Sequence, residues 1–225
     1  DAAFAQRYSP LEIILSDDCS SDSTFDIMQE MAAAYDGPHS VRILRSPENL
    51  GLVNHVITVA RLALGEYLIV NAGDDISYPE RSEILIQTFI DSRADCINSS
   101  YDEIDEFGTL VTCNKNFKPS PSTQRVFAGS SIAKRKNGIV QSTIGFAASY
   151  RTEFWVDLPL SKVKLNIEDG LATILLNCKG ATIISHPKSL IGYRVHGNSL
   201  SLRQAKDNKS DSILSRERKI SDGGK

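Results

Sequence analysis

Short apolar runs alternate with segments of helical periodicity over the first 92 residues. Three β-rich runs, at residues 11–16, 41–45 and 66–71, are typical of buried strands. Each is followed by a segment in which apolar residues recur every three or four positions. The residues predicted to face the core are Phe25, Met28, Met31, Ala32 and Tyr35, then Leu52, Val56, Val59, Ala60 and Ala63, then Ile84, Leu85, Thr88 and Phe89. This alternation predicts βαβ crossovers, and therefore an α/β fold with a mostly parallel sheet and helices on both faces.

The rest of the chain follows a less regular pattern. Strands are predicted at 94–99, 110–113, 145–150, 181–185 and 189–195, a loop at 114–122 and a helix at 168–178. From residue 203 onward the chain is polar and charged, which predicts a frayed tail or a link to a further segment. Because no internal repeat is present, the pattern indicates one domain over residues 1–202 and a polar tail over 203–225.

Composition and charge exclude several classes of protein. Of the 225 residues, 41% are hydrophobic and 24% charged, as in an ordinary globular domain. The longest apolar runs, 11–15 and 171–176, fall far short of the ~20 residues that span a bilayer. The net charge of −3 provides no general attraction to nucleic acid or acidic lipid. The exception is the basic cluster at 134–136, which is either a solvated loop or an anchor for phosphates or an anionic headgroup.

The cysteines and the first residue bear on the setting of the chain. The four cysteines are scattered without a C-x-x-C pair, so a zinc site is not predicted and a reduced, cytoplasmic setting fits best. The chain begins with Asp1, and its first methionine is Met28. We therefore expect a fragment or trimmed chain that lacks an upstream piece.

Two acidic pairs follow predicted strands, where open α/β sheets bind their ligands. Asp17 and Asp18 come after the strand at 11–16, and Asp74 and Asp75 come after the strand at 66–71. Either pair alone is compatible with a simple cap or turn. Neighbouring carboxylates repel one another unless a cation or a ligand stabilises them, so both pairs at one sheet edge favour a binding site. Such oxygen-rich sites suit Mg²⁺ or Mn²⁺.

Further candidates lie in the second half. Glu168 and Asp169 begin a predicted helix, where acidic residues are also favoured by the helix dipole alone. Arg194 and His196 follow the last predicted strand, in a loop suited to an anion or a metal. The chain contains neither a G-x-x-x-x-G-K-[ST] loop nor a G-x-G-x-x-G motif. A metal-bridged nucleoside diphosphate fits the acidic pairs without those loops.

The order of these motifs resembles the family-2 glycosyltransferases of the GT-A fold. The matching segments are EIILSDDCSSDST, NLG, ALGEYLIVNAGDD with Pro79 following, IEDG and YRVHGNSLS, which together cover about residues 3–202. Each motif alone is weak, whereas all five in this order are specific. The resemblance implies a GT-A, Rossmann-like domain that uses a nucleotide-sugar donor.

The resemblance also implies roles for single residues. Asp18 would hydrogen-bond the nucleotide base, and Asp17 would orient the turn. Asp75 would bind the metal, Mn²⁺ or Mg²⁺, with Asp74 reaching the ribose or the metal's water shell. Asp169 would be the general base on the acceptor hydroxyl. Further contacts are implied at Asn49 (nucleotide), His196 (metal or diphosphate), Glu168 (secondary to Asp169) and Arg194.

The chain departs from the family pattern in three places. The first strand of the family, with its nucleotide contact, would lie before Asp1, which predicts a gap inside the sheet. Gly73 stands where a D-x-D motif has its first acid. The helix after Gly51 has Asn54 and His55 where the family often has Arg or Lys, so these two, or the cluster at 134–136, would contact phosphate.

The leading hypothesis is an inverting, metal-dependent glycosyltransferase of bacterial cell-surface polysaccharide or lipopolysaccharide synthesis. The donor would carry UDP, dTDP or GDP, and the acceptor would be a glycan or lipid-linked, chosen by loops at about 114–145. The site would be cytoplasmic or at the inner face of the membrane. Peripheral membrane association and a homodimer are both compatible with the sequence. The alternatives are a sugar-phosphate nucleotidyltransferase and a non-catalytic sugar-nucleotide binding domain.

Overall fold

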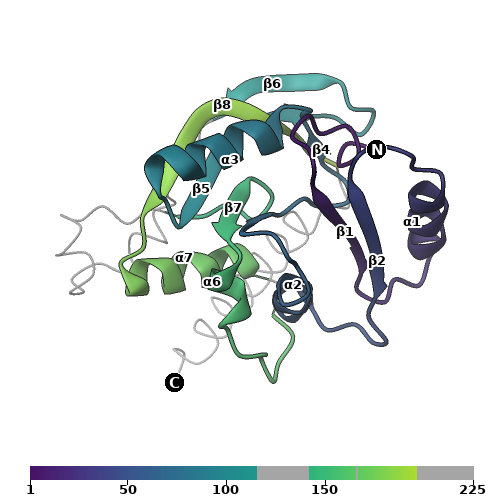
Figure 1. Ribbon diagram of the computed structural model, residues 1–225, viewed down its shortest axis with the longest axis horizontal. Coiled ribbons are helices and arrows are strands. Elements are labelled where there is room, and N and C mark those ends of the chain that lie inside the picture. The colour runs from purple at the N-terminus through teal and green to yellow at the C-terminus, as the bar shows by residue number, and fades with distance from the viewer. Residues whose placement is uncertain (116–141, 166, 197–225) are drawn as a thin grey trace, which may run out of the picture.

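The computed structural model describes residues 1–115, 142–165 and 167–196 (Figure 1). The basic cluster at 134–136, most of the acceptor loops and the tail at 203–225 lie outside these ranges. The strands are β1 (Glu12–Asp17), β2 (Ser40–Arg45), β3 (Tyr67–Ile69), β4 (Ile76–Ser77), β5 (Cys96–Ile104), β6 (Leu110–Lys115), β7 (Ala148–Arg151) and β8 (Ile183–Arg194). The helices are α1 (Thr24–Ala33), α2 (Leu52–Ala60), α3 (Arg81–Ser92), α6 (Glu153–Val156) and α7 (Glu168–Lys179).

The α/β fold class is confirmed, while the sheet is mixed rather than mostly parallel. Strands β1 and β2 form a parallel pair, and the larger sheet has the order β3-β7-β5-β8-β4 with β6 added on β5. In the larger sheet only β5 and β8 run parallel. The difference arises because β3 pairs with β7 from the second half of the chain. The alternation in the first half suggested a parallel neighbour for it instead.

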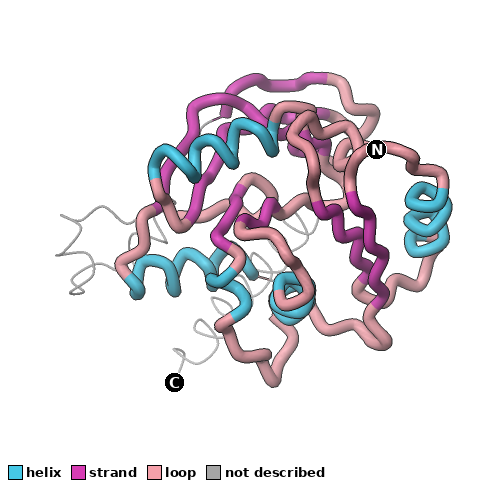
Figure 2. Tube along the Cα trace, in the orientation of Figure 1, coloured by secondary structure: helices cyan, strands magenta, loops and turns pink. Residues whose placement is uncertain are grey.

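The predicted gap in the sheet corresponds to a division into two sheets. In the ranges that the structure describes, no ladder joins the β1–β2 pair to the six-stranded sheet. Figure 2 shows the β1–β2 pair standing apart from the other strands, with α1 on its outer side. The acidic turns that follow β1 and β3 therefore belong to different sheets, so the expectation that both pairs lie at one sheet edge was wrong.

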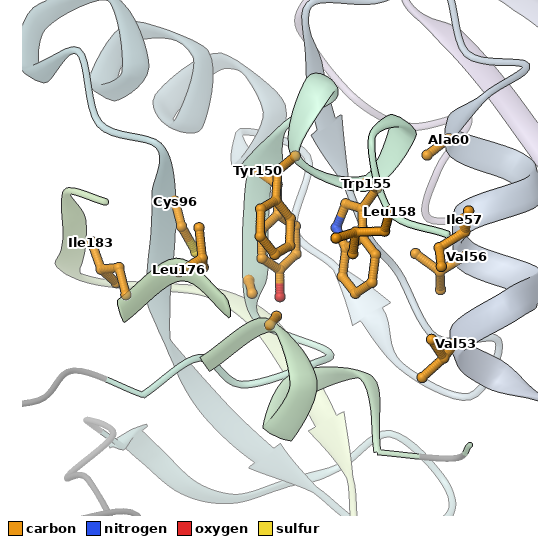
Figure 3. Packing of buried hydrophobic residues seen from close by; sticks show 13 residues of the cluster. Val53, Val56, Ile57, Ala60, Cys96, Tyr150, Trp155, Leu158, Leu176 and Ile183 are labelled. Atoms are coloured by element: carbon orange, nitrogen blue, oxygen red, sulfur yellow. The ribbon is translucent and has the colours of Figure 1, made fainter. Parts of the chain in front are cut away.

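Helices cover both faces of the larger sheet, as predicted. On one face α2, α6 and α7 pack around Trp155 and Tyr150, which Figure 3 shows between the α2 side chains and those of β5, α7 and β8. On the other face, Leu85 and Phe89 of α3 are completely buried. The short helix α6 was not predicted, although its Trp155 lies at the centre of the core.

Two predicted helix faces need correction. In α1, the predicted inward residues are the half-buried ones, but none is buried, because only two strands lie beneath this helix. In α2, the buried residues are Val53, Val56, Ile57 and Ala60, so the buried face is rotated from the predicted one. The rotation follows from packing against α6, which places Val53 and Ile57 in the core with Trp155.

The two strands predicted at 181–185 and 189–195 form one continuous strand, β8. In its pairing with β5, Ser99 lies opposite His186 and the next residue, Ser100, lies opposite Ser189, so the register shifts at this point. Pro187 lies in the skipped segment, where a residue without an N–H group is tolerated because the ladder is interrupted there. No helix in the described ranges is long and apolar enough to cross a membrane.

Candidate active site

Asp17 orients the first acidic turn from within. Its side chain is buried, and both carboxylate oxygens accept hydrogen bonds from the Ser20 amide, at 3.2 and 3.1 Å. Arg45 Nε lies 3.3 Å from Asp17 Oδ2 and balances its charge. These contacts leave Asp17 directed into the protein, where its carboxylate holds the turn through the Ser20 amide.

Asp18 joins this turn to the start of α2. Its Oδ1 accepts a hydrogen bond from the Leu50 amide at 2.8 Å, and its Oδ2 accepts one from the Gly51 amide at 2.9 Å. Gly51 has a φ of 78°, a backbone conformation that favours glycine. His55 Nδ1 is 3.5 Å from Asp18 Oδ1. The carboxylate thus binds the backbone of the NLG motif, and one fifth of its side chain remains exposed.

Asn49 lies on the exposed side of this group. Its Nδ2 donates to the Asp18 carbonyl at 3.0 Å, and its Oδ1 accepts from Lys164 Nζ at 3.3 Å. The sequence did not single out Lys164, because it lies 115 residues from Asn49 in a loop without a motif. The loop is held by the Leu165 carbonyl, which accepts from the Val53 amide at 3.0 Å. Lys164 therefore brings a positive charge to the predicted nucleotide side.

Asn54 has a structural partner. Its Nδ2 donates to the Ser161 carbonyl at 3.0 Å, and its Oδ1 accepts from the Ser161 amide at 2.7 Å. This reciprocal pair fastens the same loop to α2. The predicted phosphate contact at Asn54 thus coincides with an amide that is already engaged within the protein.

The second acidic turn gathers four of the predicted residues. Arg194 donates from its amide to Asp75 Oδ1 at 2.9 Å and from Nε to the Asp74 carbonyl at 2.7 Å. His196 Nε2 lies 3.1 Å from Asp74 Oδ2. Arg194 also donates to the Asp105 and Glu106 carbonyls, which ties the turn to the β5–β6 connection. Its guanidinium is therefore occupied in holding the turn.

The environments of the two carboxylates in this turn differ. Asp74 is about half exposed, whereas only 7% of Asp75 is exposed. Burial raises the pKa of Asp75 to about 6, and Asp74 adds to the rise, against the lowering effects of Arg194 and Arg81. Asp75 Oδ2 is buried without a hydrogen-bond partner in the described structure. An unpartnered buried carboxylate oxygen is costly unless a cation satisfies it.

The residues of this turn fit a divalent cation whose remaining ligands come from a bound substrate. Within the described residues, no group of three or more acidic, histidine or cysteine side chains could enclose a metal. Mg²⁺ in phosphate-transferring sites is commonly held by one or two carboxylates together with substrate phosphates. Asp75 Oδ2, the unpartnered oxygen, is the atom of this turn that such a cation would satisfy, with the half-exposed Asp74 beside it.

The third acidic pair begins α7. Asp169 Oδ1 accepts from the Gly170 amide at 2.7 Å, and the Asp169 carbonyl accepts from Thr143 Oγ1 at 2.8 Å. The Glu168 carboxylate lies against Gly145, and a Cβ at residue 145 would overlap it. Burial, followed by the charge of Asp169, raises the pKa of Glu168 to about 7.

The raised pKa of Glu168 predicts a pH dependence of stability. The folded protein holds this proton more tightly than the unfolded chain, so the stabilisation is complete below the ordinary pKa of 4.5. It is lost as the pH rises through about 7. Asp75 changes stability in the same direction, with a pKa that rises from 3.8 to about 6. Denaturant unfolding between pH 4.5 and 8 should therefore show a smaller fall in stability for Glu168→Gln than for the wild type. Equal slopes in the two proteins would contradict the assignment, and exposed Glu30→Gln serves as the control.

The fold of this chain is similar to the folds of several solved structures. The chain aligns with residues 1–349 of TarS from S. aureus in complex with UDP-GlcNAc, with a TM-score of 0.58 and 18% identity. The alignment covers 88% of this chain and 54% of that one. It also aligns with GalNAc-T7 bound to UDP, GalNAc and Mn²⁺, with a TM-score of 0.60 and 16% identity, covering 82% and 38%. At these identities the likeness defines the class, the GT-A fold.

The sequence profile described as Glycosyl transferase family 2 matches residues 1–156, and the chain belongs to this family. The chain is 31% identical to EpsE of Bacillus subtilis over 83 residues, which are 37% of this chain and 29% of EpsE. It is 30% identical to chondroitin synthase of Escherichia coli over 118 residues, which are 52% of this chain and 17% of the synthase. The chain thus matches less than a third of either relative.

Proposed function

We propose that this chain is an inverting glycosyltransferase that moves a sugar from a nucleoside-diphosphate sugar to a hydroxyl acceptor. The observation that carries the proposal is the placement of three acidic pairs in a family-2 chain. One pair lies at the end of β1, one lies between β3 and β4, and one begins α7. Donor binding, metal binding and proton removal each need a carboxylate, and each pair supplies one.

The nucleotide would bind at the first acidic turn. Asp18 and Asn49 would contact the base, with Asp17 holding the turn and Asp74 reaching the ribose. His55 lies beside Asp18, and Lys164 beside Asn49, so both would face the donor. The TarS and GalNAc-T7 structures contain UDP, which makes UDP the first nucleotide to test ahead of dTDP and GDP.

The metal would bind at the second acidic turn. Asp75 and His196, with Asp74, would hold Mn²⁺ or Mg²⁺, and the unpartnered oxygen of Asp75 supports this assignment. When bound, the cation would stabilise the negative charge that develops on the leaving diphosphate. The turn's own contribution is to hold two carboxylates of different exposure at one fixed position.

The acceptor would be activated at the start of α7. Asp169 would remove the proton of the acceptor hydroxyl as its oxygen attacks the anomeric carbon, and the bond from that carbon to the diphosphate would break. Glu168, half-buried against Gly145, would be secondary to Asp169. A single displacement of this kind inverts the anomeric configuration.

The biological product would be a cell-surface polysaccharide, a lipopolysaccharide or a related glycan. The similarity to chondroitin synthase supports a role in polysaccharide synthesis. The acceptor would be a glycan or a lipid-linked sugar, and the reaction would take place in the cytoplasm or at the inner face of the membrane.

The donor site is tested by thermal shift with UDP, GDP, dTDP and CMP, with and without Mn²⁺. At a hundredfold excess over Kd we expect one nucleotide to raise the Tm by about 5–10 °C, with Mn²⁺ required for the full effect. Asp18→Ala should abolish the shift. The matched control is Asp22→Ala, which removes a carboxylate of the same turn that accepts from the Thr24 amide at the start of α1. A full shift in Asp18→Ala would contradict the proposed donor site.

A further inference from the structure

A buried arginine lies beneath the second acidic turn. Arg81, in the first turn of α3, is 0% exposed. Its Nη1 donates to Ser77 Oγ at 2.7 Å and to Asn71 Oδ1 at 3.1 Å. Its Nη2 donates to the Val70 carbonyl at 2.9 Å. One guanidinium therefore contacts the chain on both sides of Asp74 and Asp75.

The same guanidinium also reaches the acceptor side. Arg81 Nη2 donates to the Phe146 carbonyl at 3.0 Å. Phe146 follows Gly145, the residue against which the Glu168 carboxylate lies. Arg81 thus bridges the turn of the predicted metal ligands and the segment that supports the acidic start of α7. The bond from Arg81 to Phe146 spans 65 positions of the sequence.

Burial of this cation needs an explanation. All four recorded hydrogen-bond acceptors of Arg81 are uncharged oxygens, and Nε has no hydrogen-bond partner in the described structure. Removing a charge from water is costly when no ion pair offsets it. Burial lowers the pKa of Arg81 to about 10, and the nearby charge of Asp75 acts in the opposite direction. A rigid guanidinium with several donors satisfies separated acceptors that a single ammonium cannot, which gives a reason for arginine at this position.

We propose that Arg81 is a positioning residue that holds the Asp74–Asp75 turn and the Gly145–Phe146 segment in one fixed arrangement. In this arrangement the cation would stabilise the leaving diphosphate while the base removes the proton of the attacking acceptor hydroxyl, so that both would serve the same displacement. This inference rests on the proposed function and deepens it, because it assigns the coupling of the two half-sites to a residue that touches neither substrate. Asn71 and Ser77, which flank the turn on its two sides, are both acceptors for Arg81.

The test compares Arg81→Lys and Arg81→Met with Arg61→Lys. Arg61 is the matched control because its Nη2 also donates to a backbone carbonyl, that of Leu158, away from the acidic turns. Mn²⁺ affinity in the presence of UDP is measured by the electron paramagnetic resonance of free Mn²⁺, and UDP affinity without metal by calorimetry. We expect Arg81→Lys to weaken Mn²⁺ binding by about tenfold, the effect typical of lost outer-shell support, and Arg81→Met to weaken it further. UDP affinity without metal should stay within about twofold of the wild type.

The outcomes separate this inference from the proposed function. Wild-type Mn²⁺ affinity and turnover in Arg81→Lys, with a cooperative melt, would overturn the positioning role. If the Arg81 variants do not fold, Ser77→Ala tests the positioning role instead. It removes one hydrogen-bond acceptor of Arg81 and should weaken Mn²⁺ binding severalfold. Unchanged Mn²⁺ affinity in a folded Ser77→Ala would then overturn it. If the wild type itself shows no Mn²⁺-dependent UDP binding, the proposed function fails and this inference fails with it.

Discussion

Asp75→Asn is expected to reduce sugar transfer by about a thousandfold, to the limit of detection in a standard assay. The substitution keeps the shape of the side chain and the acceptor for the Arg194 amide, so the turn should persist. What it removes is the negative charge beside the predicted cation. Turnover is measured by release of the nucleoside diphosphate at saturating donor and Mn²⁺.

Two controls define this result. Glu30→Gln, on the exposed surface of α1, should leave transfer unchanged. Asp74→Asn should have a smaller effect than Asp75→Asn, because Asp74 is half exposed and already shares one oxygen with His196. Because Asp75 is buried with a raised pKa, its neutral variant should be at least as stable as the wild type at pH 8. Full activity of a folded Asp75→Asn protein would show that the second acidic turn is not the metal site.

Asp169→Asn is expected to lower kcat by about 10²–10⁴-fold while leaving donor binding intact. The amide still accepts from the Gly170 backbone N–H but cannot remove a proton from the acceptor hydroxyl. The measurement is kcat for transfer, together with the UDP-induced thermal shift as a test of the donor site. Retained binding with lost turnover is the pattern that a missing general base produces.

Glu168→Gln distinguishes the two acidic residues of this pair. If Asp169 is the base, Glu168→Gln should lower kcat much less than Asp169→Asn does. The opposite order would transfer the role of base to Glu168, whose pKa of about 7 would suit it to that task. Asp91→Asn on the exposed side of α3 is the control for loss of a surface carboxylate, and it should leave kcat unchanged.

Local sequence was sufficient to locate most of the helices and strands. The runs at 11–16 and 41–45 form β1 and β2, and the acidic start of the helix at 168 forms α7. The spacing of apolar residues and the presence of turn residues are local properties, so they can be recognised without knowledge of the fold. The burial of Leu85 and Phe89 was predicted from the helical period of the apolar residues. The prediction is confirmed because α3 packs against the larger sheet.

Strand pairing was not predictable from the same pattern. β3 lies beside β7, and β5 lies between β7 and β8, so both depend on partners from distant parts of the chain. A run of apolar residues indicates a strand but not its neighbour. The rotated core face of α2 has a similar origin, because α6, with only four residues, is too short for a periodic signal.

Some residues of the candidate site were likewise predictable from the sequence, and others were not. The acidic pairs were visible in the sequence because adjacent carboxylates after strands are unusual, and the order of motifs assigned them to a family. Lys164 and Arg81 were not visible, since a single basic residue in a loop or at a helix start carries no periodic or motif signal. Their importance comes from contacts with residues 115 and 65 positions away. Residue types and spacing therefore predicted the family of this chain and the chemistry proposed for it. Long-range packing alone established which charges meet, because contacts between distant segments exist only after the chain has folded.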